Sequence, residues 1–321
     1  MLYLIVGAGH CRDIMRIYLD HNILDALSKN RMTLQVPSDT VWVYSNENFN
    51  EIKRSKNMRF LDVLANLKAR MLELEFDKHF MLTERAFLYE FRDPHELYSQ
   101  WLEHTNEVPI DDVVQLQMQF LARLAGANNH DEMLLHPVRL REFLHSLLSP
   151  LDLISSDVEA RIEQVVKDIE IVTTGQLLEI QNLEHSRTSI GIGRGRVGNL
   201  SVDDNPLKLI WGVMRNKYPG MTIEQFYGFE PVDKQGYEKW PRYLGVVGCH
   251  TVLNFLGFHP DKGLNSINKI PGILSDANHT AMATYCDAVM SQDQRFCAKA
   301  RAIYQYLELD IAVIEAVPNV N

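Results

Sequence analysis

The feature that most constrains the fold is an α/β rhythm that occupies both ends of the chain. Residues 17–20 and 40–45 are short runs rich in β-branched and aromatic residues, and each is followed by a polar segment typical of a helix start. The same rhythm returns near the C-terminus, with a strand predicted at 288–290, a helix over 293–307 and a final strand at 311–314. The two ends therefore predict parts of one α/β domain.

The middle of the chain has the periodicity of helices. From about residue 58 apolar residues recur every three or four positions, and similar stripes run along 110–124 and 158–169. The first stripe, which predicts one continuous helix, consists of Phe60, Leu64, Leu67, Met71 and Leu74. No fixed-period repeat appears in this stretch, so the sequence does not indicate a solenoid.

These patterns predict an α/β fold with a central, mostly parallel sheet, interrupted by a long, mainly α-helical insertion. At 321 residues the chain exceeds the usual size of one compact domain, which agrees with this division. Because Met15 stands directly before the first strand, we expect the residues that precede it to lie outside the fold. The predicted boundaries are an N-terminal extension at 1–14, a first part of the α/β domain at 15–57, the insertion at 58–242 and a second part at 243–321.

The charge of the chain limits how it could contact a polyanion. Its net charge of −10 at pH 7 argues against coating nucleic acid through bulk charge. A nucleic acid would instead have to meet a local basic patch. Two candidate patches are Lys53 with Arg54, and Arg194 with Arg196 inside the glycine-rich stretch 189–199. That stretch lacks the Gly-Lys-Ser/Thr ending of a phosphate-binding loop, so an ordinary surface loop is its alternative interpretation.

Cysteine usage and hydropathy favour a cytoplasmic protein. The four cysteines show neither CxxC pairing nor zinc-finger spacing, which favours reduced thiols packed in the core. The apolar opening at 1–10 is too short to span a bilayer and lacks both a basic flank and a convincing cleavage site. We therefore expect a cytoplasmic protein without a membrane segment.

Carboxylates follow the predicted strands at both ends of the chain. An open α/β sheet places its site at the carboxyl ends of its strands, where Asp20 and Asp293 both fall. Glu51 lies on the helix after the second strand, and Asp276 is predicted to open a helix that runs to about Tyr285. We expect these four carboxylates to gather at one edge of the sheet.

A cluster of four carboxylates has a specific chemical consequence. Such groups repel one another and raise each other's pKa unless a divalent cation is bound. Oxygen ligands of this kind suit Mg²⁺ or Mn²⁺. These ions lower the pKa of a bound water and stabilise the leaving oxygen of a phosphodiester, which is the chemistry of a metal-dependent nuclease. No Ser-His-Asp or Cys-His arrangement in the sequence points to a protein nucleophile instead.

The sequence around these acids resembles the PIN-domain ribonucleases, the fold of many toxin nucleases and RNA-processing enzymes. The matching segments are IYLDHNIL, SNENFNEI and SDANHTAMATYCDAVMSQDQRF. In that family one Asp ends the first strand, a Glu follows the second, a third acid opens a late helix and a fourth lies in a Ser/Thr-x-Asp motif. The resemblance therefore implies a three-layer PIN-like domain whose catalytic and metal-binding residues are Asp20, Glu51, Asp276 and Asp293.

Several neighbours of these acids are candidates for supporting roles. The resemblance makes Ser291 the hydroxyl of the motif and matches Asp287 to an acidic position that varies more within the family. Asn22 could contact the site or hydrogen-bond the start of its helix. Helix capping is also the structural alternative for three of the acids, namely Asp20, Asp276 and Asp293.

Two further candidates concern the second acid. Glu47 lies one helical turn before Glu51 and could take its place as a ligand. Glu51 itself could belong to a solvated helix face, since basic residues follow it. His279, close to a candidate acid, could orient a water, a phosphate or a carboxylate, or serve as a local hydrogen-bond partner.

The sequence therefore predicts a cytoplasmic Mg²⁺- or Mn²⁺-dependent endoribonuclease that uses one or two metal ions. RNA is the nucleic acid that the resemblance favours. Two alternatives stay open, namely a catalytically inactive PIN-like module that binds nucleic acid or protein, and a DNA-directed defence nuclease. The resemblance also implies a homodimer and, as in toxin-like members, an inhibitory or targeting protein partner. The insertion departs from the small members, so its role is open.

Overall fold

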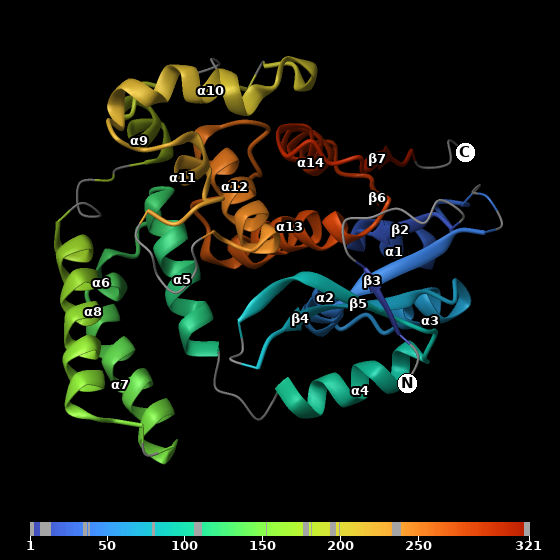
Figure 1. Cartoon of the computed structure of the whole chain (residues 1–321), viewed down its shortest axis with the longest axis horizontal. Coiled ribbons are helices and arrows are strands. Elements are labelled where there is room, and N and C mark those ends of the chain that lie inside the picture. Colours follow the sequence, from blue (N-terminus) through green and yellow to red (C-terminus); the bar gives the residue numbers. More distant parts are fainter. Residues whose placement is uncertain are drawn as a thin grey trace. The chain divides into compact units, whose positions relative to one another are not determined.

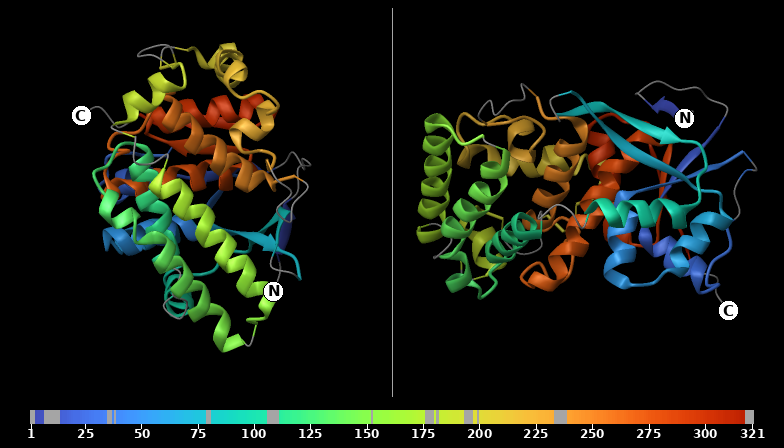
Figure 2. Two further views of the ribbon diagram at one scale, coloured as in Figure 1. Left: turned by 90° about the vertical axis from the view of Figure 1, so that its left-hand side faces the viewer. Right: turned by 90° about the horizontal axis from the view of Figure 1, so that it is seen from below.

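The computed structural model divides the chain into two compact units. One unit comprises 1–105, 195–260 and 274–321, and the other comprises 106–194 and 261–273. Figures 1 and 2 show their elements coloured along the sequence. The residues that the structure describes are 3–6, 14–34, 37, 39–78, 81–105, 111–151, 153–175, 180, 182–192, 197–198, 200–232 and 239–317.

Among the described residues, the first unit contains a seven-stranded, mostly parallel sheet. Its strands are β1 (Tyr3–Val6), β2 (Arg16–Leu19), β3 (Val41–Ser45), β4 (Arg70–Phe76), β5 (Leu82–Tyr89), β6 (Ala288–Ser291) and β7 (Ala312–Glu315). The strand order is β1-β5-β4-β3-β2-β6-β7, in which β5 is antiparallel to β1 and β4 and the other pairs are parallel. The sheet confirms the predicted α/β class, and β2, β3, β6 and β7 confirm the four predicted strands.

The order of the parallel strands reverses beside β2. The chain proceeds from β2 through β3 to β4 on one side, whereas β6 and β7 lie on the other side. Leu19 of β2 pairs with Met290 of β6, so blue β2 and red β6 run together to the same edge (Figure 1). Open α/β sheets bind ligands at such a reversal, beyond the carboxyl ends of the strands.

Helices cover the strands of this unit. They are α1 (His21–Ser28), α2 (Asn46–Ser55), α3 (Arg59–Asn66), α4 (Pro94–Thr105), α10 (Pro206–Met214), α11 (Ile223–Tyr227), α12 (Arg242–Leu256), α13 (Ile270–Met282) and α14 (Gln294–Tyr306), with 3-10 helices at Val202–Asp204, Arg215–Lys217 and Ala283–Tyr285. Helix α14 confirms the helix predicted over 293–307. The first residues of α13 belong to the second unit.

The two faces of the sheet have different partners. Ile17, Leu19 and Tyr44 form one buried cluster with residues of α1, α2, α3 and α4. Tyr18 points to the opposite face because successive strand residues alternate. Its hydroxyl there contacts His279 of α13. Side chains of β2 therefore join the helices on both faces of the sheet.

Strands β4 and β5 correct the prediction of a continuous helix from residue 58. Helix α3 ends at Asn66, and the chain enters β4 after Lys68, whose φ of 49° is left-handed. Met71 and Leu72 are both buried, so this strand lacks the alternation that would distinguish it from a buried helix. Residues 58–105 and 195–242, predicted as insertion, belong to the compact unit that contains the sheet.

Strand β1 comes from the predicted N-terminal extension. Tyr3 pairs with Tyr89 and Val6 pairs with Ala86, in antiparallel register with β5. The expectation that 1–14 lie outside the fold is therefore corrected at residues 3–6, which form an edge strand of the sheet.

The second unit is helical in its described parts. Its helices are α5 (Asp111–Leu124), α6 (His130–Met133), α7 (His136–Leu148), α8 (Ser156–Thr174) and α9 (Leu183–Ser189), with 3-10 helices at Ser149–Leu151 and Ile267–Lys269. Helices α5 and α8 confirm the predicted stripes. Helices α7 and α8 lie side by side (Figure 2), and Arg141 Nε lies 2.7 Å from Glu163 Oε1 between them.

Two global expectations concern membranes and thiols. Over the ranges that the structure describes, each helix is too short or too polar to cross a bilayer. Cys249, Cys286 and Cys297 are free and buried, as expected of core thiols. Cys11 lies outside the described residues.

Candidate functional site

Three parallel strands end at one edge of the sheet with polar residues. Asp20 follows β2, Ser45 ends β3 and Ser291 ends β6. Because these strands are neighbours, the three side chains lie at the edge where the strand order reverses. Asp20 is only 3% exposed and caps α1, since its Oδ1 accepts from the backbone N–H of His21 at 2.6 Å.

A hydrogen-bond network joins Asp20 to the C-terminal part of the chain. Ser291 Oγ donates to Asp20 Oδ2 at 2.6 Å, although 271 positions separate the two residues. Asn22 Nδ2 donates to Asp20 Oδ2 and, at 2.9 Å, to Ser291 Oγ. Asn22 Oδ1 also accepts from the backbone N–H of Gln292 at 2.8 Å. Asn22 therefore takes the first of its two predicted roles and contacts the site.

Asp293 belongs to the same network through Ser291. The backbone N–H of Asp293 donates to Ser291 Oγ at 3.0 Å. Asp293 Oδ1 accepts from the backbone N–H groups of Arg295 and Phe296 at 2.7 and 3.1 Å, so Asp293 is the N-cap of α14. Ser291 thus connects the Asp20 carboxylate to the turn that holds Asp293, and Asp293 has a capping role at the site.

Glu51 reaches this edge from α2. Its Oε2 lies 2.9 Å from His279 Nε2 and 3.1 Å from His21 Nδ1, and its Oε1 lies 3.4 Å from Arg54 Nη2. Burial acts to raise the pKa of Glu51, but its interactions with His279, His21 and Arg54 outweigh burial and lower that pKa to about 2. Glu51 is therefore an ionised carboxylate surrounded by basic side chains.

His279 connects the carboxylates from α13. It is fully buried, its Nδ1 lies 2.8 Å from the Tyr18 hydroxyl, and its Nε2 lies 4.0 Å from Asp20 Oδ1. Burial acts to lower the pKa of His279, but the carboxylates of Glu51 and Asp20 raise it to about 9. Burial is also the main cause that raises the pKa of Asp20 to about 6, against the opposing charge of His279. His279 is therefore a buried cation between two carboxylates at neutral pH.

Three residues of the network, Tyr18, Ser45 and Asn48, were not predicted from the sequence. The Tyr18 hydroxyl lies 2.6 Å from Ser45 Oγ. Asn48 Oδ1 accepts from the backbone N–H of Ser45 at 2.9 Å, and Asn48 Nδ2 donates to the Leu19 carbonyl at 3.1 Å. A signal for Tyr18 existed, because it stands two positions before Asp20 and strand side chains repeat every two residues. An aromatic residue in a strand is equally typical of a core, however, so this signal alone does not identify a site residue.

Glu47 and Glu51 both face α13 but have different partners. Glu47 Oε1 accepts from Ser275 Oγ at 2.6 Å, and its Oε2 accepts from Asn278 Nδ2 at 2.9 Å. Glu51 instead contacts His279 and so shares a network with Asp20. This arrangement favours Glu51 over Glu47 as the second acid.

Asp276 does not open its helix, which corrects the sequence prediction. Helix α13 begins at Ile270, and Pro271 lies in its first turn, where proline is well tolerated. Asp276 is half-buried in the middle of α13. It stands three positions before His279, so the two side chains are neighbours on the helix surface.

Asp287 lies at the other end of the strands. It directly precedes β6, and its carboxylate oxygens accept from Arg16 Nε at 2.9 Å and Arg16 Nη2 at 2.7 Å. Asp287 Oδ2 also accepts from the backbone N–H of Arg16 at 2.8 Å. Asp287 therefore holds the beginnings of β2 and β6 together and does not support the site at their carboxyl ends.

The predicted basic patches are only partly covered by the described residues. Lys53 and Arg54 are exposed on α2, where Lys53 Nζ lies 5.7 Å from the centroid of the Trp101 ring. Arg194 and Arg196 lie outside the described residues.

The donor atoms of the site suit a hard cation, but they do not surround one point. Asp20, Glu51 and Asp293 provide carboxylate oxygens, which Mg²⁺ and Mn²⁺ prefer. Within the described part of the chain, no group of three or more His, Cys, Asp or Glu side chains is placed to hold a metal ion. His279 Nε2 already contacts the Glu51 carboxylate, so a cation that binds Glu51 there would have to displace the imidazole.

The site is therefore an ionic network at the strand-order reversal. It joins three predicted acids, Asp20, Glu51 and Asp293, through Ser291 and His279. The carboxylates of this network can attract a cation, and the protonated imidazole can donate a hydrogen bond to a phosphate. Comparisons of the chain with protein-family models, with curated proteins and with solved structures found no match.

Proposed function

We propose that the chain is a metal-dependent endonuclease of PIN type that hydrolyses phosphodiester bonds, with RNA as the favoured substrate. The observation that carries this proposal is the contact of Ser291 with Asp20. It joins the two segments that resemble the family, at the position where open α/β sheets bind ligands.

The side chains around this contact have distinct roles in the proposal. Ser291 and Asn22 orient the Asp20 carboxylate, because both donate to its Oδ2. His279 balances the charge of Glu51 in the absence of a divalent cation. A divalent cation held by Asp20, Glu51 and Asp293 would supply Lewis-acid stabilisation of the phosphodiester.

The test is cleavage of labelled single-stranded RNA and DNA in Mg²⁺, in Mn²⁺ and in EDTA. We compare the wild type with Asp293→Asn, because asparagine caps helices as well as aspartate and so preserves the start of α14. The matched control is Asp25→Asn, which removes one charge from α1, where the Asp25 carboxylate pairs with the exposed Lys29.

The expected result is metal-dependent cleavage by the wild type and by Asp25→Asn. Asp293→Asn should cleave at least about 100-fold more slowly, the usual effect of removing one charge-stabilising group. Cleavage that persists in EDTA, or equal rates for the two variants, would contradict the proposal. Preferred cleavage of the DNA strand would assign the alternative DNA-directed nuclease.

A binding module without turnover is the second candidate, and the pairing of Glu51 with His279 favours it. Glu51 is already paired with the buried cation His279, so its charge is balanced without a divalent cation. Under this alternative the wild type binds single strands but cuts none of them with either metal. Asp293→Asn would then bind as the wild type does.

A further inference from the structure

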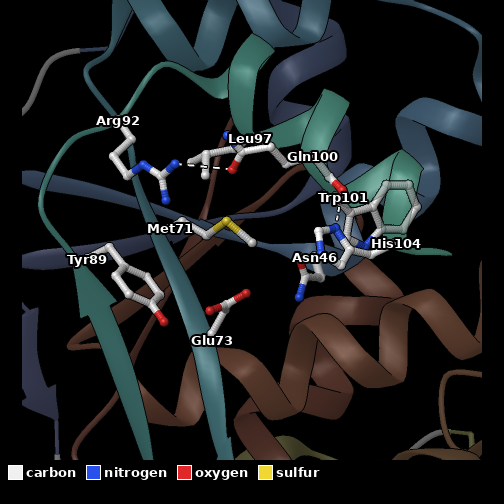
Figure 3. Close-up of a pocket in the computed structure, with 9 residues that line it drawn as sticks. All are labelled: Asn46, Met71, Glu73, Tyr89, Arg92, Leu97, Gln100, Trp101 and His104. Carbon is white, nitrogen blue, oxygen red and sulfur yellow. Dashed lines mark hydrogen bonds between the residues drawn. The ribbon is translucent and has the colours of Figure 1, made fainter. Parts of the chain in front are cut away.

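A cavity of about 310 Å³ lies beside the candidate site in the same unit. Figure 3 shows its walls, with Glu73 of β4 and Tyr89 of β5 on the strand side and Trp101 of α4 opposite them. Asn46, the first residue of α2, completes the wall. Pockets that hold small ligands begin at about this volume.

The cavity has a flat, apolar part suited to an aromatic ring. Its lining includes Met71, Leu97, Tyr89 and Trp101. Trp101 is held in place by stacking on Tyr98, with ring centroids 5.8 Å apart and an interplanar angle of 19°. A fixed tryptophan face is a platform on which a nucleobase can stack.

The polar part of the cavity carries one charge of each sign. The guanidinium of Arg92 donates to Gln100 Oε1 at 3.1 Å, which leaves further N–H groups for a ligand. The carboxylate of Glu73 makes no hydrogen bond or ion pair with any described residue. Figure 3 shows Arg92 and Glu73 at two ends of the cavity wall, with Met71 between them and Tyr89 beside them.

Two buried polar atoms near the cavity also lack partners among the described residues. They are Asn46 Oδ1 and the hydroxyl of Tyr44, which is fully buried. Burial raises the pKa of Tyr44, and Tyr44 pairs in the sheet with Met71 of the cavity lining. Each is a buried polar group whose partner is either a bound water or a ligand in the cavity.

We infer that this cavity binds a guanine base of a single-stranded nucleic acid that also reaches the candidate site across α2. The base edge of guanine presents an N1–H and an amino group side by side, which a carboxylate such as Glu73 accepts together. Its O6 accepts from a guanidinium such as Arg92. The ring would stack on Trp101.

Other bases match this pair of charges less well. Adenine presents its amino group beside an acceptor nitrogen, which would face the Glu73 carboxylate without a proton. The N3–H of uracil lies between two carbonyl oxygens, both of which repel a carboxylate. Cytosine offers a single amino group. Guanine alone supplies two adjacent donors and an acceptor.

Helix α2 connects the cavity to the candidate site. Asn46 and Lys53 lie on the face of α2 towards the cavity and Trp101. Glu51 stands five residues after Asn46, so at about 3.6 residues per turn it lies nearly on the opposite side of α2, where it contacts His279. A side-chain-bearing helix is about 10 to 12 Å across, so a strand that passes over α2 can reach both. The inference rests on the proposed function, which identifies the ligand as a nucleic-acid strand.

The experiment measures binding of short uridine oligonucleotides in EDTA, each with one central guanosine, adenosine, cytidine, uridine or inosine. Inosine is guanosine without the amino group, so it removes one donor to Glu73. The wild type should bind the guanosine strand about 10-fold or more tightly than the others, since hydrogen bonds to charged groups have this effect.

Glu73→Gln should bind the guanosine strand about 10- to 100-fold more weakly and should no longer distinguish guanosine from inosine. The matched control is Glu96→Gln, an exposed position on α4 outside the cavity lining, which should bind as the wild type does. Equal binding of all five strands by the wild type, or an unchanged guanosine preference in Glu73→Gln, overturns the inference.

The outcomes separate this inference from the proposed function because EDTA removes the divalent cations. A guanosine preference in a protein that cleaves nothing supports the base site and defeats the nuclease proposal. Cleavage without any base preference does the reverse.

Discussion

Replacing Ser291 by alanine tests the contact on which the site depends. The Ser291 hydroxyl donates to Asp20 Oδ2 at 2.6 Å and accepts from Asn22 Nδ2 and from the backbone N–H of Asp293, at 2.9 and 3.0 Å. Ser291 is fully buried, so water does not replace the lost hydroxyl in the variant. Ser291→Ala therefore removes three hydrogen bonds and adds no bulk.

The expected loss follows from the kind of each hydrogen bond. A hydrogen bond to a charged group contributes about 1.5 to 3 kcal/mol. A buried donor left without an acceptor, here the N–H of Asp293, adds about 1 kcal/mol. The free energy of unfolding of the unit that contains the sheet should therefore fall by about 2.5 to 4 kcal/mol in Ser291→Ala.

The measurement is urea unfolding followed by tryptophan fluorescence. All four tryptophans lie in the unit with the sheet, so the signal reports on that unit. The control is Ser28→Ala on α1, where a partly exposed hydroxyl donates to the Asp25 carbonyl at 2.9 Å and its loss should change stability by less than about 0.5 kcal/mol. If Ser291→Ala is as stable as Ser28→Ala, the reasoning about the network is wrong.

Two further predictions concern residues away from this contact. Asp287→Asn should lower the free energy of unfolding by about 1.5 to 3 kcal/mol, because the Arg16 guanidinium loses its charged acceptors. Cleavage by the folded variant should stay unchanged. Slower cleavage at an equal folded fraction would place Asp287 in the site. Burial lowers the pKa of His136 from 6.5 to about 4, so its contribution to stability is full above pH 6.5 and is lost as pH falls towards about 4. Urea unfolding followed by circular dichroism across this window should show a steeper loss for the wild type than for His136→Gln, and parallel curves would exclude the effect.

The sequence predicted those parts of the fold where an apolar run ends abruptly at a polar residue. Asp20 and Ser291 follow short apolar runs, so the ends of β2 and β6 were visible without any tertiary information. Strand β4 was missed because it is covered on both faces, and Met71 and Leu74 then continue the spacing of the preceding helix. The start of α13 was placed at Asp276 because Ser-Asp-Ala-Asn has the composition of a helix cap.

The site was predicted as a set of acids but not as a network. The contact of His279 with Glu51 joins residues 228 positions apart and depends on how α13 packs near α2. Tyr18 was not among the predicted site residues, because burial and hydrogen bonding of an aromatic residue have the same sequence pattern. Local patterns identify which residues stand at a strand end, whereas their partners are set by packing.

The 271 positions between Asp20 and Ser291 also have a consequence for biosynthesis. A ribosome adds about 5 to 20 residues per second, so Asp20 waits roughly 15 to 55 s for Ser291 to be made. Throughout that interval β2 has no β6 beside it, and Asp20 has only its local partners. A nascent chain therefore cannot form a complete site before Ser291 and Asp293 have been translated. Until then, a site that cuts RNA cannot act on the messenger RNA that is being translated.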